Sequence, residues 1–214
     1  MRHIALFDMD GTLIDSGLDI TLSINYVRAS CYNLDPLSVQ CVVDTINAPV
    51  RNLSEIFYGK EHYEERAREL FEAHYFEQCI QNVTPYHGIH DLLNVLKKNN
   101  VIMGVATNAP SIFAKRMLKH LELDSFFQLI VGADDVDAPK PHPQMLHRHL
   151  DHYNYHIGTD YALMIGDNSK DMEAAKRAGI AGVFAGWGFS SKGEGDYFAS
   201  SPQALLDIIY TNRR

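Results

Sequence analysis

Cysteine is scarce in this sequence. Its 214 residues include only three cysteines, Cys31, Cys41 and Cys79. An odd number of cysteines with no Cys-x-x-Cys pair does not indicate a disulfide framework. The pattern predicts reduced thiols and therefore a cytoplasmic protein.

Long apolar runs are also missing. The longest, such as Val101 to Ala106 and Tyr161 to Gly166, are far shorter than the roughly 20 residues of a transmembrane helix. After Met1 the chain reaches Asp8 and Asp10 before the apolar stretch of a secretion signal could form. We therefore expect neither a membrane partner nor a secretory leader.

Positive charge is in deficit. The chain has 19 Lys and Arg residues against 27 Asp and Glu residues, which gives a net charge of −8 at pH 7. Because such a chain repels a polyphosphate backbone, nucleic acid is not an expected partner. The composition, 46% hydrophobic and 21% charged, is that of a globular protein and excludes disorder or a fibrous repeat. The length suggests one domain, with room for a smaller inserted one.

Short apolar runs alternate with stretches of helical period. The first run, from His3, ends at Asp8 and is followed by Gly11, which favours a buried strand over a helix. Similar runs are Val101 to Ala106, Phe127 to Val131, Tyr161 to Gly166 and Ile180 to Ala185. Between them apolar residues recur at helical spacing, as in Ile89, Leu92, Leu93 and Leu96. The alternation predicts an α/β fold whose parallel sheet is covered on both faces.

Residues 17–83 interrupt this alternation. They contain no convincing strand, and their apolar residues recur at helical spacing instead. In the segment Lys60 to Cys79, for example, Ala67 and Phe71 lie one helical turn apart. We therefore predict a core of residues 1–16 and 84–214 and a helical insert of residues 17–83.

Two acids stand at the end of the first predicted strand, where open parallel sheets place their ligand sites. They are Asp8 and Asp10, and Gly11 and Thr12 follow them. The glycine lets the chain turn so that both carboxylates can face one pocket. Taken alone, the pair also fits a turn with a helix-capping acid.

Polar residues follow three later strands in the same way. Thr107 and Asn108 precede a proline that can open a helix, Lys140 stands between two prolines, and Asp167 and Asp171 open a helical stretch. Each has a plainer explanation: an N-cap, an exposed loop lysine, or acids that favour a helix dipole. Four strand ends that bring acids, a hydroxyl and a lysine to one crevice make coincidence a poor explanation.

These motifs, in this order and over nearly the whole chain, resemble those of the haloacid dehalogenase superfamily of phosphatases. The pattern is similar to that of the phosphoglycolate phosphatase and β-phosphoglucomutase group. The resemblance implies a Rossmann-like core with an inserted α-helical cap of the C1 type, which agrees with the insert of residues 17–83. It also implies a Mg²⁺ cofactor and a small phosphorylated metabolite as substrate, of the 2-phosphoglycolate or sugar phosphate class.

The resemblance further implies a role for each motif residue. Asp8 would be the nucleophile, and Asp10 the general acid and base. Asp8, the backbone carbonyl of Asp10, and Asp167 would hold Mg²⁺. A phosphate dianion repels a carboxylate nucleophile, so the chemistry needs this cation and a lysine.

The remaining motif residues bind phosphate or support the site in this resemblance. Thr107 and Asn108 would hold the phosphoryl oxygens, and Lys140 would neutralise their charge. Gly11, Thr12 and Asp171 would support the site without contacting the phosphoryl group.

Weaker signals have competing explanations. His149, His152 and His156 would share one helical face, which a solvated surface explains better than a zinc site because no cysteine is near. Glycines around Trp187 indicate a loop between the last strands, and such a loop could border the mouth of the site. In the insert, Arg51 could contact a second anion on the substrate or pair with Glu55 one helical turn on.

Two alternatives stay open at this level. A phosphotransferase resembling β-phosphoglucomutase would use the same residues and return the phosphoryl group to a sugar. A signalling module resembling a response-regulator receiver also accepts phosphate on aspartate, but it needs neither the insert nor Asp10. We expect a phosphoric monoester hydrolase that is a monomer or a small homo-oligomer.

Overall fold

The computed structural model describes residues 1–48 and 52–211. The chain divides into two compact units, one of Met1–Asp15 with Pro85–Arg214 and the other of Ser16–Thr84. We call the first the sheet unit and the second the helical unit. The function of the helical unit as a cap stays a prediction.

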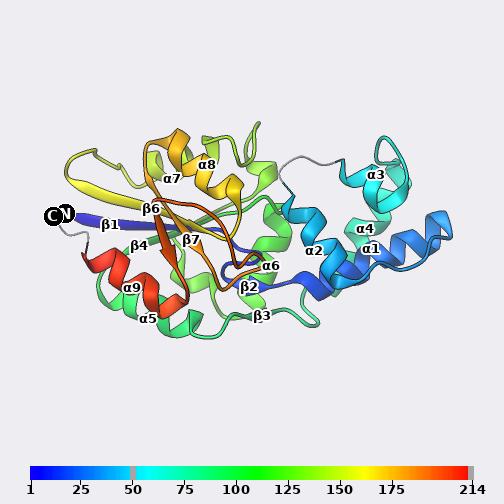
Figure 1. Cartoon of the computed structure of the whole chain (residues 1–214), viewed down its shortest axis with the longest axis horizontal. Helices are drawn as coiled ribbons and strands as arrows, with labels where there is room; N and C mark the ends of the chain where they lie inside the picture. Colours follow the sequence, from blue (N-terminus) through cyan, green and yellow to red (C-terminus); the bar gives the residue numbers. More distant parts are fainter. Residues whose placement is uncertain (49–51, 212–214) are drawn as a thin grey trace. The chain divides into compact units, whose positions relative to one another are not determined.

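Six parallel strands form the sheet (Figure 1). They are β1 (Arg2–Phe7), β4 (Ile102–Ala106), β5 (Leu129–Val131), β6 (Asp160–Gly166), β7 (Ala181–Ala185) and β8 (Tyr197–Ala199). Their order is β5-β4-β1-β6-β7-β8. The chain therefore builds outward from β1 in one direction and then in the other, which creates a switch point at the carboxyl end of β1. The predicted Rossmann-like α/β core is confirmed. The strand β8 was not predicted, because Tyr197–Ala199 lies between polar residues and is not part of a longer apolar run.

Helices cover both faces of the sheet (Figure 1). On one face α5 (Ile89–Lys98) packs with α9 (Pro202–Thr211), and on the other α7 (Gln144–His152) packs with α8 (Ser169–Ala178). The remaining elements are α6 (Ser111–His120), the 3₁₀ turns η1 (Asp124–Phe126) and η2 (Ala133–Asp135), and the short strands β2 (Ile14–Asp15) and β3 (Thr84–Pro85).

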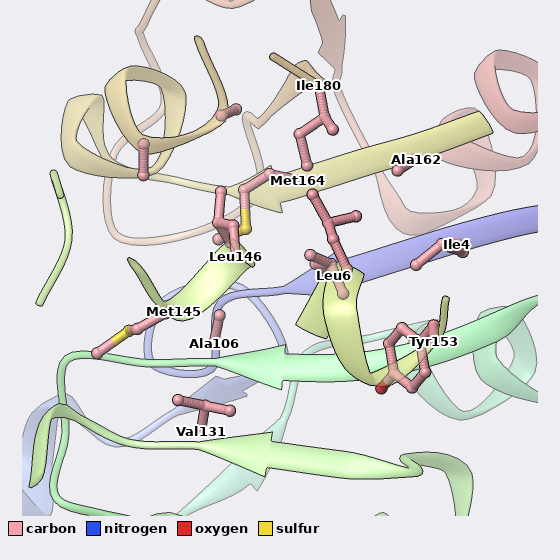
Figure 2. Close-up of a cluster of buried hydrophobic side chains, with 13 residues drawn as sticks. Ile4, Leu6, Ala106, Val131, Met145, Leu146, Tyr153, Ala162, Met164 and Ile180 are labelled. Atoms are coloured by element: carbon pink, nitrogen blue, oxygen red, sulfur yellow. The ribbon is translucent and has the colours of Figure 1, made fainter. Parts of the chain in front are cut away.

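The core under α7 and α8 is drawn in Figure 2. Side chains from β1, β6 and α7 meet there: Ile4, Leu6, Ala162, Met164, Met145 and Leu146. The alternate residues of β1, Ala5 and Phe7, are also buried. Because both faces of β1 are covered, its sequence is a continuous apolar run rather than an alternating one.

One polar side chain is enclosed near this core. His149 of α7 is buried, with Nε2 at 2.9 Å from the carbonyl oxygen of Val105 and Nδ1 at 3.4 Å from the hydroxyl of Tyr153. Gly104 of β4 makes room for it, since a Cβ there would lie 2.6 Å from His149 Nδ1. Burial lowers the pKa of His149 to about 4. The expected solvated histidine face is therefore wrong for His149, and α7 ends before His156.

The described part of the helical unit contains four helices. They are α1 (Gly17–Tyr32), α2 (Val39–Asn47), α3 (Leu53–Tyr58) and α4 (Glu65–Gln78), so the helix expected from Lys60 begins five residues later. Its core gathers Ile24 and Val27 of α1 with Val42, Phe57 and Ala67. Among residues 1–48 and 52–211, none of the helices combines the length and apolar character needed to cross a bilayer.

A buried acid ties the two ends of the helical unit together. Asp19, in the first turn of α1, accepts hydrogen bonds from Gln78 Nε2 at 2.8 Å, Asn82 Nδ2 at 2.7 Å and the Asn82 backbone N–H at 3.0 Å. These donors replace water around the buried carboxylate. The start of the unit is thereby fixed to its end.

Candidate active site

The turn after β1 carries the first site residues. The carbonyl of Met9 accepts hydrogen bonds from the backbone N–H groups of Thr12 (3.2 Å), Leu13 (2.8 Å) and Ile14 (3.1 Å), which closes the turn. Gly11 has φ of +80°, a left-handed conformation that glycine adopts without strain. Asp8 and Thr12 are buried in this turn, and Asp10 is half-buried.

Strand register brings the motifs to one edge of the sheet. Phe7 of β1 pairs with Val105 of β4 and with Ile165 of β6. Thr107 lies two residues after Val105, and Asp167 lies two residues after Ile165. They therefore flank Asp8 at the carboxyl end of the sheet.

Lys140 joins the acids of two motifs. Its Nζ donates to Asp8 Oδ1 at 2.8 Å and to Asp171 Oδ1 at 2.6 Å, and its side chain is 2% exposed. The Asn108 amide holds the lysine backbone, with Nδ2 donating to the Lys140 carbonyl at 2.8 Å and Oδ1 accepting from its N–H at 3.0 Å. The Asn108 side chain thus positions the lysine loop, and its contact with phosphate stays a prediction.

The two later acids are oriented by local hydrogen bonds. Asn168 caps α8, and its backbone N–H donates to Asp171 Oδ2 at 3.1 Å. The hydroxyl of Thr12 donates to Asp167 Oδ1 at 3.3 Å, and the backbone N–H of Phe189 donates to Asp167 Oδ2 at 3.0 Å. Both carboxylates are therefore held in fixed directions.

The site contains more negative charge than its lysine offsets. Burial raises the pKa of Asp167 to about 8, and the charges of Asp8 and Asp171 contribute to the rise. Burial also raises the pKa of Asp171 to about 7, although Lys140 acts in the opposite direction. Burial alone would lower the pKa of Lys140, but Asp171 and Asp8 raise it above its ordinary value. The lysine therefore stays charged, and a further cation would stabilise the carboxylates.

Three carboxylates are placed so that they could share such a cation. Asp8, Asp167 and Asp171 are buried, and each offers an oxygen within 4.8 Å of the others. Hard oxygen ligands of this kind suit Mg²⁺. Two of the three, Asp8 and Asp167, belong to the predicted ligand set, and their carboxylates fit the predicted metal.

The remaining predicted residues are Thr107, Asp10 and Arg51. Thr107 is buried, and its Oγ1 accepts a hydrogen bond from the backbone N–H of Ala109 at 3.1 Å, just before α6. Asp10 lies in the turn beside Asp8, where its role as acid and base stays a prediction. Arg51 lies outside the described residues, so its suggested contact with the substrate stays a prediction too.

Two neighbours of the site complete it, the loop after β7, which was suggested to border the site mouth, and Tyr86, which was not predicted. The loop after β7 contacts the motifs directly, because Trp187 Nε1 donates to the Thr12 carbonyl at 2.9 Å and Phe189 bonds Asp167. Burial raises the pKa of Tyr86, and the charges of Asp15, Asp167 and Asp10 add to this effect. The glycines around Trp187 signalled a loop, but no local pattern marked Tyr86.

Comparisons with known proteins agree with this geometry. Residues 5–185 match the family model of the haloacid dehalogenase-like hydrolases. The chain is 32% identical over 209 residues to the phosphoglycolate phosphatase of Aquifex aeolicus (strain VF5), covering 97% of this chain and 96% of the relative. It is 29% identical over 213 residues to the N-acetylmuramic acid 6-phosphate phosphatase of Pseudomonas aeruginosa, covering 95% and 93%. The crystal structure of a predicted phosphoglycolate phosphatase from Haemophilus somnus 129PT shares the fold, with a TM-score of 0.81, 23% identity and 97% of each chain covered.

Proposed function

Because this chain belongs to the haloacid dehalogenase-like hydrolases, we propose that it is a Mg²⁺-dependent phosphatase that acts through an aspartyl phosphate on Asp8. One observation carries the proposal. The buried carboxylate of Asp8 contacts the buried Lys140 ammonium at 2.8 Å, and two further buried acids lie beside it at the switch point of the sheet. Such a site can accept an anion at a carboxylate nucleophile.

The residues that would hold Mg²⁺ are Asp8, Asp167 and the backbone carbonyl of Asp10. When bound there, the ion supplies positive charge that reduces the repulsion between a phosphate dianion and Asp8. Lys140 supplies a second positive charge at the same carboxylate. Asp171 supports the site through Lys140, which it contacts at 2.6 Å.

The reaction then needs two displacements. Asp8 attacks phosphorus, the bond between phosphorus and the ester oxygen breaks, and Asp10 donates a proton to the departing alkoxide. Water next attacks the phosphorus of the aspartyl phosphate, the ionised Asp10 takes a proton from that water, and the bond between phosphorus and the Asp8 oxygen breaks. Inorganic phosphate leaves, and both aspartates return to their starting states.

The proposed substrate is a small phosphorylated metabolite. The two named relatives act on phosphoglycolate and on N-acetylmuramic acid 6-phosphate, and both substrates are small phosphate monoesters. We propose the same class here, either 2-phosphoglycolate or a sugar phosphate. A phosphotransferase would use the same residues and differ only in the acceptor, whereas a receiver-like module does not fit a family of hydrolases.

The test is turnover of a panel of phosphate monoesters by the purified chain. We expect repeated release of inorganic phosphate from at least one ester, and its loss both in EDTA and in the Asp8→Asn variant. Asp151→Asn, at an exposed acid of α7, is the matched control and should keep wild-type turnover. Absence of turnover on every ester, or full turnover in Asp8→Asn, would contradict the proposal. Transfer of phosphate to a sugar without its release would identify the phosphotransferase instead.

A further inference from the structure

The connection between β7 and β8 has an unusual form. Parallel neighbours are usually joined by a helix, because the chain must return along the whole length of the sheet. Residues 186–196 make this return with no helix. The first part of this connection contacts the site instead, through three consecutive residues, Trp187, Gly188 and Phe189. We call these three residues the crossover segment.

A closed chain of hydrogen bonds, which we call the circuit, connects the crossover segment with Thr12 and Asp167. Trp187 Nε1 donates to the Thr12 carbonyl at 2.9 Å, and the Thr12 hydroxyl donates to Asp167 Oδ1 at 3.3 Å. Asp167 Oδ2 accepts from the Phe189 N–H at 3.0 Å. Since Phe189 is two residues from Trp187, the circuit begins and ends in the crossover segment. Both oxygens of Asp167 are thereby held from two sides.

Two glycines allow the backbones to approach closely enough for this circuit. A Cβ on Gly188 would lie 1.7 Å from the carbonyl oxygen of Gly11 and 2.8 Å from the Cβ of Asp167. A Cβ on Gly11 would lie 2.4 Å from Asp167 Oδ2 and 2.7 Å from a ring carbon of Phe189. Real Cβ atoms do not tolerate such distances, so the contact requires glycine at both positions.

We propose that the crossover segment positions the Asp167 carboxylate for metal binding. This inference rests on the proposed function, in which Asp167 is a Mg²⁺ ligand. Asp8 and Asp171 repel Asp167, so an unrestrained carboxylate would turn away from them and lose its alignment. Hydrogen-bonded partners behind a metal ligand prevent such rotation, and their removal typically lowers metal affinity 10- to 100-fold.

The segment also contains a natural probe. Trp187 is the only tryptophan in the chain, and its indole N–H bonds to the residue that in turn bonds Asp167. Its fluorescence should therefore change when Mg²⁺ binds, at concentrations set by the metal affinity.

The experiment is a calorimetric titration of the full chain with Mg²⁺ alone. Trp187→Phe keeps an aromatic ring but removes the N–H donor, and we expect it to weaken Mg²⁺ binding by about 10-fold or more. Gly188→Ala should weaken binding further, because its Cβ would collide with Gly11. The matched control is Tyr153→Phe, which removes a hydrogen bond of 3.3 Å to the Met103 carbonyl in the same unit. It should bind Mg²⁺ like the wild type.

The outcomes separate the two proposals. If the wild type binds Mg²⁺ and Trp187→Phe binds it equally well, the positioning role is wrong while the proposed function stands. If the wild type binds no Mg²⁺ by calorimetry or by Trp187 fluorescence, the metal-dependent function itself is overturned, and the positioning role with it. Should Gly188→Ala fail to fold, the Trp187→Phe comparison decides alone.

Discussion

At the scale of single residues, the site holds ionisable groups in a buried environment, where desolvation disfavours their charged forms. Asp8, Asp167, Asp171 and Lys140 are all buried. Replacing buried ion pairs with apolar groups often leaves stability unchanged or increases it, so such a cluster is not explained by stability. Shifted pKa values with specific charged neighbours are typical of functional sites. The arrangement therefore agrees with the proposed binding of a cation and a phosphoryl group.

Asp10 carries a prediction at this scale. In Asp10→Asn the side chain can no longer donate a proton to the leaving group, so turnover of an alkyl phosphate should fall by about 10² to 10⁴-fold. Hydrolysis of p-nitrophenyl phosphate should fall less, because that leaving group needs little protonation. The measurement is kcat/KM for both esters in wild type and variant. Equal losses on the two esters would place the general acid elsewhere.

At the scale of elements, the ends of helices and strands orient the site. The cap of α8 directs Asp171 toward Lys140, and the Asn108 amide after β4 fixes the lysine loop. Behind them, His149 joins α7 to β4 by its contact with the Val105 carbonyl. Two residues after Val105 lies Thr107, so this buried contact supports a strand that ends in the site.

The pH dependence of stability should show the burial of His149. Its pKa falls from about 6.5 in the unfolded chain to about 4 in the folded one, because burial disfavours the charged ring. The unfolded state therefore binds the proton first, and stability is lost as the pH falls from about 6.5 to 4. The contribution is about 3 kcal/mol at pH 4. His149→Gln removes this titration, so its free energy of unfolding in urea should fall less steeply over this range.

Groups around His149 set the control for this measurement. The His149 ring contacts the Val105 carbonyl and the Tyr153 hydroxyl, and the charges of His152 and Arg148 lower its pKa further. His152 lies on the same helix but is exposed, so His152→Gln should keep the wild-type slope. A slope for His149→Gln equal to that of the wild type would mean that the folded protein accommodates a charged ring at this position.

At the scale of the whole molecule, metal binding should change stability as well as activity. A ligand that binds only the folded state stabilises it, by about 2.7 kcal/mol when its concentration is 100 times its dissociation constant. Mg²⁺ should therefore raise the unfolding temperature, and EDTA should reverse the rise. Differential scanning calorimetry measures both effects.

Asp167→Asn provides the matched comparison. Burial and the charges of Asp8 and Asp171 disfavour the ionised form of Asp167, and the amide of the variant avoids this cost, so the metal-free variant should unfold at a higher temperature than the metal-free wild type. It should also lose the stabilisation by Mg²⁺. A variant that Mg²⁺ still stabilises as much as the wild type would remove Asp167 from the ligands.

The sequence alone determined the type of fold and the identity of the candidate residues. Buried parallel strands need continuous apolar runs, and such runs were visible before Asp8, Thr107 and Asp167. Because parallel strands end at one edge, polar residues just after them were expected to meet, and the structure places them there. This inference needs only local patterns and the direction of the strands.

Only the tertiary structure decided which groups touch. The order of the strands, the contact of Lys140 with Asp171, the burial of His149 and the crossover segment all join residues far apart in the chain. Such contacts depend on how helices and loops pack, and packing leaves no periodic mark in a sequence. Trp187 illustrates the limit: glycines showed that a loop was present, but only the folded chain showed that it bonds the turn after β1.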